Sequence, residues 1–345
     1  MEKYLPYCLD SLLVHNHQEE LEVLVVNDGS TDNTYEEAQR YANAYPEVFR
    51  CIDKKNGNYG SCINVGLSKA TGKYVKVLDA DDSFDVVNFD KFLEFLTQID
   101  ADLILSDFEV VNNDRVPQRT IRYNFPIKGV VSFYEICNTS EFVGAIQMHA
   151  VTYRRELLRS MHYHQTEGIS YTDQQWIFTP MIAVKTVAYF GAVVYRYLVG
   201  REGQTMDPKV RMRSMEHARQ NSMGLILDYE THKGEISSPM IKSYLYSRLA
   251  WYIKDIYITH ITNYTKVNAA ILRDYDQSIK EQSIEIYNMI ASKDISSVLG
   301  FAYIDYWRRH KIPSVLVNVF ARVVKILMLV KSKINSRKDK LSIGN

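Results

Sequence analysis

Residues Tyr74 to Asp82 read Tyr-Val-Lys-Val-Leu-Asp-Ala-Asp-Asp, an apolar run that ends abruptly in acids. The run predicts a buried strand over Tyr74 to Leu78. An isolated buried carboxylate is costly, so the acids are expected at the carboxyl edge of the sheet, where open α/β sheets bind ligands. Asp79 and Asp81 are close enough in sequence to serve one divalent cation, and their hard oxygens suit Mg²⁺ or Mn²⁺. A solvated acidic turn or a helix N-cap is the alternative for so short a motif.

The strand–helix alternation extends on both sides of this stretch. Apolar runs predict strands at residues 22–27, 48–52 and 102–107, and amphipathic stretches predict helices at 4–14, 32–45, 61–70 and 87–98. The first of these strands also ends in an acid, Asp28. A glycine-rich loop, Asn56 to Ser61, precedes the helix at 61–70, whose free backbone N–H groups can hold an anion. This alternation predicts a mainly parallel, doubly wound sheet flanked by helices.

Beyond residue 107 the alternation stops. Residues 108–134 are expected to form a loop and hairpin region, and 147–153 and 187–196 are expected to return to the sheet. Between them, Asp173 is expected on a loop just before a helix, and Arg201 is expected to follow the last strand.

Composition limits the classes of function. The chain has 345 residues, 46% of them hydrophobic, which is enough for one large domain or for a domain with an appendage. Its 41 basic and 41 acidic residues argue against a general nucleic-acid binder. The four cysteines lack metal-type spacing and suggest reduced thiols in a cytosolic setting. We expect no signal peptide, because charged and aromatic residues follow Met1.

The chain after Met206 reads as helical. Its last helix, Pro313 to about Ile334, is very apolar, but Arg322 and Lys325 fall near its middle and many lysines and arginines flank it. Mid-segment charges disfavour a spanning helix, whereas a basic amphipathic helix suits the surface of an anionic membrane. A helix packed on its neighbours, with a solvated basic tail, is the alternative.

Taken together, four stretches resemble the inverting glycosyltransferases of family 2, which have the GT-A fold. In order, they are Val26-Asn27-Asp28-Gly29-Ser30-Thr31-Asp32, the loop and helix from Asn56 to Gly72, Leu78-Asp79-Ala80-Asp81-Asp82, and Tyr171-Thr172-Asp173-Gln174-Gln175-Trp176. The resemblance covers about 205 residues, so we expect a GT-A domain over residues 1–205 and a helical region over 206–345. The helical remainder looks like the tail of bacterial members that build capsules and other surface polysaccharides.

The resemblance implies roles for matching positions. It implies that Asp28 contacts the base of a UDP-sugar, that Asp79 contacts the ribose or assists the metal, and that Asp81 ligates the cation bridging the diphosphate. Asp173 would be the general base that deprotonates the acceptor hydroxyl, and Asn64 would contact the donor. The remaining candidates are two for the diphosphate, Arg201 and Gln204, and three for the acceptor, Gln174, Gln175 and Trp176.

Two departures from the family pattern stand out. Family members usually begin with a β-strand and a Pro-x-Tyr-Asn-type stretch just before the helix that this chain has at 4–14. By the family pattern, both would come before Met1. That strand would lie inside the sheet, so we expect either a misplaced start or a truncated and inactive protein. In addition, Ile63 stands where many members have an arginine, so donor contacts there are in question.

The sequence therefore predicts a metal-dependent inverting glycosyltransferase, peripheral on the cytoplasmic face of the membrane. Its donor would be a nucleotide-diphosphate sugar and its acceptor a saccharide, lipid-linked or not. The rival hypotheses are a truncated pseudo-enzyme kept as a membrane-associated partner, and a sugar nucleotidyltransferase. Sugar nucleotidyltransferases usually have a Gly-x-Gly loop with Arg and Lys near the first strand, and no such loop is visible in this sequence.

Overall fold

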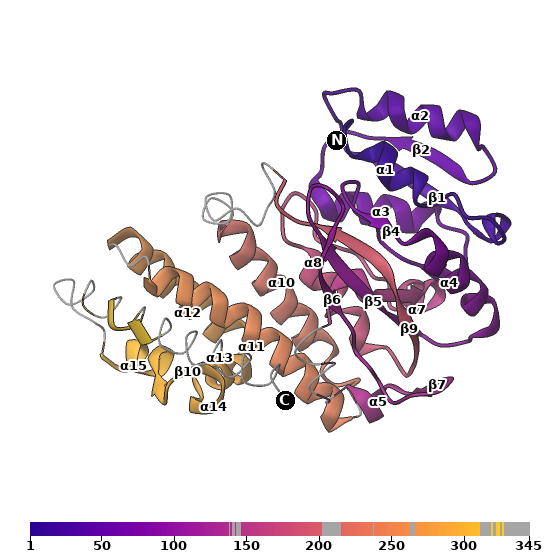
Figure 1. Cartoon of the computed structure of the whole chain (residues 1–345). Helices are drawn as coiled ribbons and strands as arrows, with labels where there is room; N and C mark the ends of the chain where they lie inside the picture. The colour runs from indigo at the N-terminus through magenta and orange to yellow at the C-terminus, as the bar shows by residue number, and fades with distance from the viewer. Residues whose placement is uncertain are drawn as a thin grey trace. The chain divides into compact units, whose positions relative to one another are not determined.

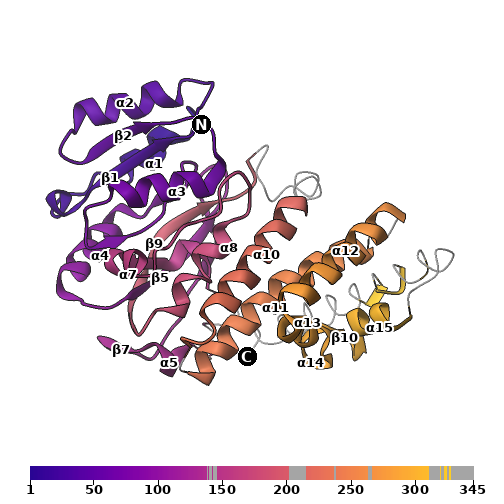
Figure 2. The same ribbon diagram turned by 180° about the vertical axis from the view of Figure 1, so that it is seen from behind.

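The protein is described from a computed structural model, shown in Figures 1 and 2. The model describes residues 1–137, 139, 142, 146–201, 215–236, 238–262, 266–310, 319, 322–324 and 326–327. The chain divides into two compact units. The first comprises Met1–His217 and Gly234–Leu245, and the second comprises Ala218–Lys233 and Tyr246–Asn345. The domain boundary predicted between residues 205 and 206 lies outside the described residues.

Two sheets organise the first unit. Its strands are β1 (Val23–Asn27), β2 (Phe49–Asp53), β3 (Tyr74–Val75), β4 (Ser83–Phe84), β5 (Leu103–Val111), β6 (Pro117–Ile121), β7 (Val130–Ser132), β8 (Val151–Arg154) and β9 (Thr186–Leu198). β1 and β2 form a parallel pair, and the larger sheet has the order β3-β8-β5-β9-β4, with β6 on β5 and β7 on β9. β5 pairs with strands on both of its sides and is buried along nearly its whole length.

Helices flank these strands, as expected for an α/β fold. The helices of the first unit are α1 (Leu5–Asp10), η1 (Gln18–Glu20), α2 (Thr34–Ala44), α3 (Asn58–Lys69), α4 (Val86–Gln98), α5 (Phe133–Ile136), η2 (Met148–Ala150), α7 (Arg155–Ser160), α8 (Asp173–Trp176) and η3 (Pro180–Ile182). α2 packs on β2, and α3 packs on β1 (Figure 1). The predicted alternation is therefore confirmed through β5.

The strand pairing differs from the expected one. β1 with β2 and β5 with β9 are parallel, but β3, β4, β6 and β7 each pair antiparallel with their neighbours, as does β8 with β5. After β5 the chain returns by a hairpin to β6, and antiparallel neighbours need no helical crossover. The sheet is thus mixed rather than mainly parallel.

β3 is shorter than the apolar run predicts. The structure assigns only Tyr74–Val75 to a strand, whereas the prediction extended to Leu78. Residues 76–79 have no strand partner among the described residues, since β1 belongs to a different sheet. The sequence pattern shows that a segment is apolar. It does not show whether a neighbouring strand is present to pair with that segment.

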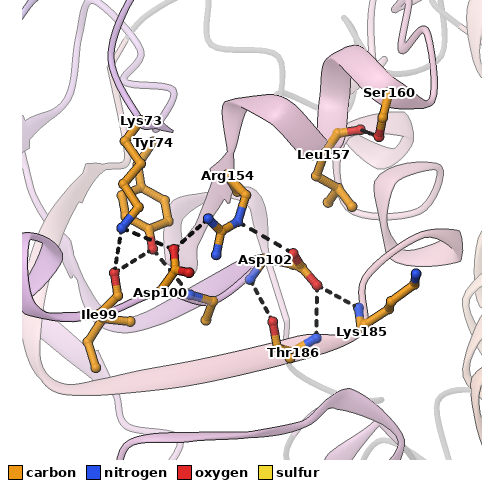
Figure 3. Close-up of polar contacts among 11 residues, drawn as sticks. Lys73, Tyr74, Ile99, Asp100, Asp102, Arg154, Leu157, Ser160, Lys185 and Thr186 are labelled. Atoms are coloured by element: carbon orange, nitrogen blue, oxygen red, sulfur yellow. Dashed lines mark hydrogen bonds and ion pairs between the residues drawn. The ribbon is translucent and has the colours of Figure 1, made fainter.

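Ion pairs hold together the sheet edge at the start of β5, opposite to its carboxyl end (Figure 3). The Arg154 guanidinium lies 2.5 Å from Asp100 and 3.5 Å from Asp102. One oxygen of Asp102 accepts hydrogen bonds at 3.0 Å from the backbone N–H groups of Lys185 and Thr186. These contacts fix the start of β9 against the start of β5, where the two parallel strands begin to pair.

The second unit is mainly helical. It contains most of α10 (Met215–His232) and α11 (Pro239–Thr262), followed by α12 (Lys266–Gln282), α13 (Ile284–Ala291), α14 (Lys293–Ser296), the two-residue strands β10 (Ser297–Val298) and β11 (Phe301–Ala302), and α15 (Tyr303–His310). The hairpin of β10 and β11 was not expected. Of the predicted helix from Pro313, the structure describes only residues 319, 322–324 and 326–327, which are helical.

Candidate active site

Asp28 lies just after β1 and anchors the glycine-rich loop. Its carboxylate accepts a 2.9 Å hydrogen bond from the backbone N–H of Gly57 and pairs with the Lys54 ammonium. The same ammonium donates to the Ser61 hydroxyl at 2.7 Å. The loop is therefore held against the end of β1 by a charge-assisted network, which sequence spacing did not reveal. α3 begins at Asn58, three residues before the predicted start, with its N-terminal turn beside Asp28.

Asp79 and Asp81 follow the short β3 and lie in a crowded anionic environment. Burial first, and then the charges of Asp81 and Asp173, raise the pKa of Asp79 to about 7, while the Arg201 charge opposes this rise. The carboxylate of Asp81 forms an ion pair with the Arg201 guanidinium. The structure thus places together four residues that the sequence nominated from three separate stretches.

Asp82 has a different position from its neighbour. Its side chain is fully buried and accepts hydrogen bonds from the Tyr195 hydroxyl at 2.5 Å and from the backbone N–H of Leu198 at 2.7 Å. Burial, followed by the charges of Asp79 and Asp81, raises the pKa of Asp82 well above its usual range. Asp82 ties the acidic turn to β9, and its buried carboxylate is not accessible to a ligand.

Asp173 is the first residue of α8, and the loop that leads to it is tied to α3. The Asn64 amide donates to the backbone oxygen of Gln165 and to Glu167, and its oxygen accepts from the Gln165 backbone N–H, each at 2.8 Å. The Gln165 side chain in turn donates to the backbone oxygen and hydroxyl of Thr172, at 3.0 and 2.9 Å.

Both polar atoms of the Asn64 amide are therefore engaged within the chain. The predicted contact of Asn64 with the donor would compete with these bonds. The geometry instead makes Asn64 a residue that positions the loop before Asp173.

Gly60 allows this loop to approach α3 closely. A β-carbon at Gly60 would lie 2.0 Å from the backbone oxygen of Thr166. The loop also bonds to the glycine-rich loop through Gly168, whose N–H donates to the Gly57 oxygen at 2.9 Å. Two separate motifs, the glycine-rich loop and the Asp173 loop, are thereby built as one structure.

The three acceptor candidates have different environments in the structure. Gln174 contacts the Asp173 carboxylate at 3.2 Å and stays a candidate. Gln175 and Trp176 are only 4% and 1% exposed. The Gln175 amide oxygen accepts from the Thr166 N–H at 2.8 Å, and Trp176 packs against two tyrosine rings. Both side chains are therefore interior residues, and the acceptor role predicted for them is withdrawn. Gln204 lies outside the described residues.

The acidic residues fit a divalent cation through their chemistry. In the described part of the chain, no group of three or more His, Cys, Asp or Glu side chains is placed to hold a metal ion. Mg²⁺, however, is commonly held by one or two carboxylates together with substrate phosphates. Asp79 and Asp81 supply such a pair. Burial first, and then the neighbouring negative charges, raise the pKa of Asp79, and a bound cation would oppose this rise.

Several residues of the site escaped the sequence analysis. Tyr59, in the glycine-rich loop, is near enough to Asp79 and Asp173 for their charges, after burial, to raise its pKa well above the usual range. The Tyr195 hydroxyl donates its hydrogen to Asp82 and accepts from the Asp79 N–H. It therefore has no hydrogen left to donate to a ligand. A tyrosine in a glycine-rich loop was a visible signal, but 25 tyrosines in the chain obscured it.

Comparison with known proteins finds glycosyltransferases among those similar to this chain. The family model described as "Glycosyl transferase family 2" matches residues 1–160. An uncharacterized glycosyltransferase of Mycoplasma pneumoniae is 42% identical over 85 residues, which are 24% of this chain and 28% of that protein. The poly(ribitol-phosphate) beta-N-acetylglucosaminyltransferase TarS of Staphylococcus aureus is 26% identical over 208 residues, which are 60% of this chain and 35% of TarS. Each match thus spans about a third or less of the relative.

The fold is also found in a solved structure. The crystal structure of S. aureus TarS 1-349 in complex with UDP-GlcNAc has a TM-score of 0.62 to this chain at 18% identity, and the match covers 90% of this chain and 89% of that one. The chain therefore has the GT-A fold of TarS 1-349, with a helical C-terminal region. The family model covers residues 1–160, which is less than half of the chain.

Proposed function

We propose that this protein is a metal-dependent inverting glycosyltransferase that moves a sugar from a nucleotide-diphosphate donor to a saccharide hydroxyl. The observation that carries the proposal is the convergence of Asp79, Asp81 and Asp173 beside Arg201. Three carboxylates near one guanidinium can bind a cation, hold a diphosphate and take a proton, which are the three tasks of this reaction. The match of the family 2 model to residues 1–160 and the likeness of fold to TarS support the same conclusion.

A UDP-sugar is the donor that we propose. Asp28 lies at the carboxyl end of β1, where it can accept a hydrogen bond from a base such as uracil, and α3 presents its N-terminal turn nearby. The solved TarS structure of like fold holds UDP-GlcNAc. TarS acts, by its name, on poly(ribitol-phosphate), which supports a role for this chain in a cell-surface glycan, including a capsule or exopolysaccharide.

The positions of these side chains support the following chemistry. Asp173 takes the proton of the acceptor hydroxyl as its oxygen attacks the anomeric carbon, and one attack from the face opposite the leaving group inverts that carbon. Asp79 and Asp81 would hold the divalent cation, which when bound neutralises charge on the departing nucleoside diphosphate. Arg201, now paired with Asp81, supplies a second positive group for the diphosphate.

Replacing Asp173 by asparagine tests the assignment directly. Asp173→Asn should leave donor affinity nearly intact while kcat falls by about 10² to 10⁴, the usual value of a general base. Release of nucleoside diphosphate in the presence of acceptor is the measurement. Asp100→Asn is the matched control, because Asp100 is an exposed acid at the opposite edge of the sheet. Loss of donor affinity with unchanged turnover of bound donor would make Asp173 a binding residue instead.

We also propose that the enzyme works at the cytoplasmic face of the membrane on a lipid-linked acceptor. The support is the pattern of the segment Pro313 to Ile334, which combines an apolar face with basic flanks. Among the residues that the structure describes, no helix is long and apolar enough to cross a bilayer.

A further inference from the structure

The hairpin of β5 and β6 carries an arginine that the proposed mechanism does not use. Arg115 stands in the turn of this hairpin, and its guanidinium donates a 2.9 Å hydrogen bond to the backbone oxygen of Asp81. The same guanidinium lies over the ring of Tyr7 in α1, 4.1 Å from the ring centroid. Among the described residues, no carboxylate forms an ion pair with Arg115. This arginine is thus engaged with a main-chain oxygen and an aromatic face rather than with an acid.

The turn that carries Arg115 is held together by Asn112. The Asn112 side-chain oxygen accepts from the backbone N–H groups of Asp114 and Val116, both at 3.0 Å. Its backbone oxygen accepts from the Arg115 N–H at 2.8 Å. Arg115 has a φ of 60°, in the left-handed region that glycine and asparagine adopt more easily than arginine. The shape of the turn therefore does not account for an arginine here, whereas the bond to Asp81 does.

The same turn also contacts the residue that precedes Arg201. The Asn113 side-chain amide donates to the backbone oxygen of Gly200 at 3.1 Å. Gly200 has a φ of 93°, so its backbone takes a conformation that suits glycine. One hairpin turn therefore contacts the main chain on both sides of the ion pair between Asp81 and Arg201.

Two tyrosines beside each other on the first helix support the two arginines. The Arg201 guanidinium lies 5.9 Å from the ring centroid of Tyr4. Tyr4 is the N-cap of α1 and Tyr7 comes three residues later, a spacing that places both on one side of the helix. Asp81 is thus approached by two guanidinium groups, but they bind different atoms. Arg201 pairs with the carboxylate of Asp81, and Arg115 binds its backbone oxygen.

We propose that Arg115 is a positioning residue, which holds the backbone of Asp81 in place while the Asp81 carboxylate exchanges Arg201 for a divalent cation. A cation and a guanidinium compete for the carboxylate, so the pair with Arg201 must open when the metal binds. The backbone oxygen takes no part in that competition, so the bond from Arg115 is kept in both states. The role rests on the proposed function, in which Asp81 ligates the cation, and it matches the way that outer residues orient metal ligands elsewhere.

The sign of the change in metal affinity separates this role from simple electrostatics. By charge alone, Arg115→Gln should tighten Mn²⁺ binding, because it removes a positive charge near the cation. The positioning role predicts the reverse: the Mn²⁺ dissociation constant should rise about 10- to 100-fold, the usual effect of losing a residue that orients a metal ligand. The measurement is a titration of the full chain with Mn²⁺, followed by the electron paramagnetic resonance signal of the free ion.

Two further variants complete the comparison. Arg119→Gln is the matched control, because Arg119 is an exposed arginine of β6 and its loss changes the net charge equally. Its Mn²⁺ dissociation constant should equal that of the parent. Arg115→Lys keeps the charge and one donor but loses the planar fork, so its dissociation constant should lie between those of the parent and Arg115→Gln. It also carries the test by itself if Arg115→Gln does not fold, since its affinity should still fall below that of the parent.

Thermal unfolding of the same variants distinguishes positioning from a merely structural role. A structural role would lower the thermal midpoint of Arg115→Gln and leave the Mn²⁺ dissociation constant of the folded protein unchanged, which would overturn the proposal. Tighter Mn²⁺ binding by Arg115→Gln would overturn it as well. If the parent binds no Mn²⁺, the metal assignment itself fails. Normal binding by the parent together with equal binding by both Arg115 variants would refute only the role of Arg115.

Discussion

Gly60→Ala should disable catalysis without touching a reacting group. Gly60 is buried in α3, and a β-carbon there would lie 2.0 Å from the Thr166 oxygen and 2.8 Å from the Thr166 carbonyl carbon. Real β-carbons essentially never lie under 3.0 Å from another heavy atom. The obstacle is backbone rather than a flexible side chain, so the loop before Asp173 must move by about 1 Å.

The magnitude follows from three terms. Over-packing costs about 1 to 3 kcal/mol, and each loop hydrogen bond that is lost costs about 1 kcal/mol. Alanine regains about 1 kcal/mol of helix propensity. With two of the hydrogen bonds from Asn64 lost, the unfolding free energy falls by about 2 to 4 kcal/mol, or roughly 4 to 16 °C in thermal midpoint. A 1 Å misplacement of Asp173 should cost about 10² in kcat.

Two measurements decide the matter: thermal unfolding, and nucleoside diphosphate release at saturating donor. Gly66→Ala is the matched control, since it makes the same substitution in the same helix with nothing within 4 Å. Its midpoint should rise slightly, and its kcat should stay near that of the parent protein. Equal kcat values for the two variants would refute the view that contact between α3 and the loop positions Asp173.

Three further predictions concern the metal, pH and the membrane. EDTA or Asp81→Asn should abolish transfer, and Mn²⁺ or Mg²⁺ should restore only the EDTA-treated parent; full activity in EDTA would remove the metal assignment. The raised pKa of Asp79 means that the folded state holds a proton that the unfolded state has lost, so this group's contribution to stability falls as pH rises from about 4 to about 7. Asp79→Asn should flatten that part of the stability profile in thermal unfolding, and an unaltered profile would contradict the assignment. Removal of residues from Pro313 onward should end flotation with anionic liposomes at low salt while sparing donor hydrolysis; a full-length chain that does not float would contradict membrane attachment.

The local parts of the fold could be predicted because their signals are local. β1, α2, β2 and α4 begin and end within two residues of the ranges predicted for them. Asp28 was correctly expected directly after a strand, whereas Asp79 comes four residues after the end of β3 and is half-buried. The same reasoning could not give the pairing of β3, because pairing depends on a neighbour far away in the chain.

Long-range contacts decided the rest of the site. Asp81 and Asp82 look alike in the sequence, but Asp82 is buried by Tyr195 and Leu198, more than 110 residues away. Trp176 follows a predicted catalytic residue, yet the turn of α8 directs it into the core. A helix of four residues is too short for its sequence pattern to reveal which side faces inward.

The ion pair between Asp81 and Arg201 has a thermodynamic consequence for how ligands enter. A cation that binds Asp81 must displace the guanidinium, and a diphosphate offers that guanidinium a new partner. Each ligand therefore breaks the ion pair that the other would otherwise have to break. Metal and nucleotide should accordingly bind with positive cooperativity. Linkage requires the coupling to be reciprocal: UDP should tighten Mn²⁺ by the same factor as Mn²⁺ tightens UDP. In Arg201→Gln the metal should bind more tightly on its own, and the coupling should shrink.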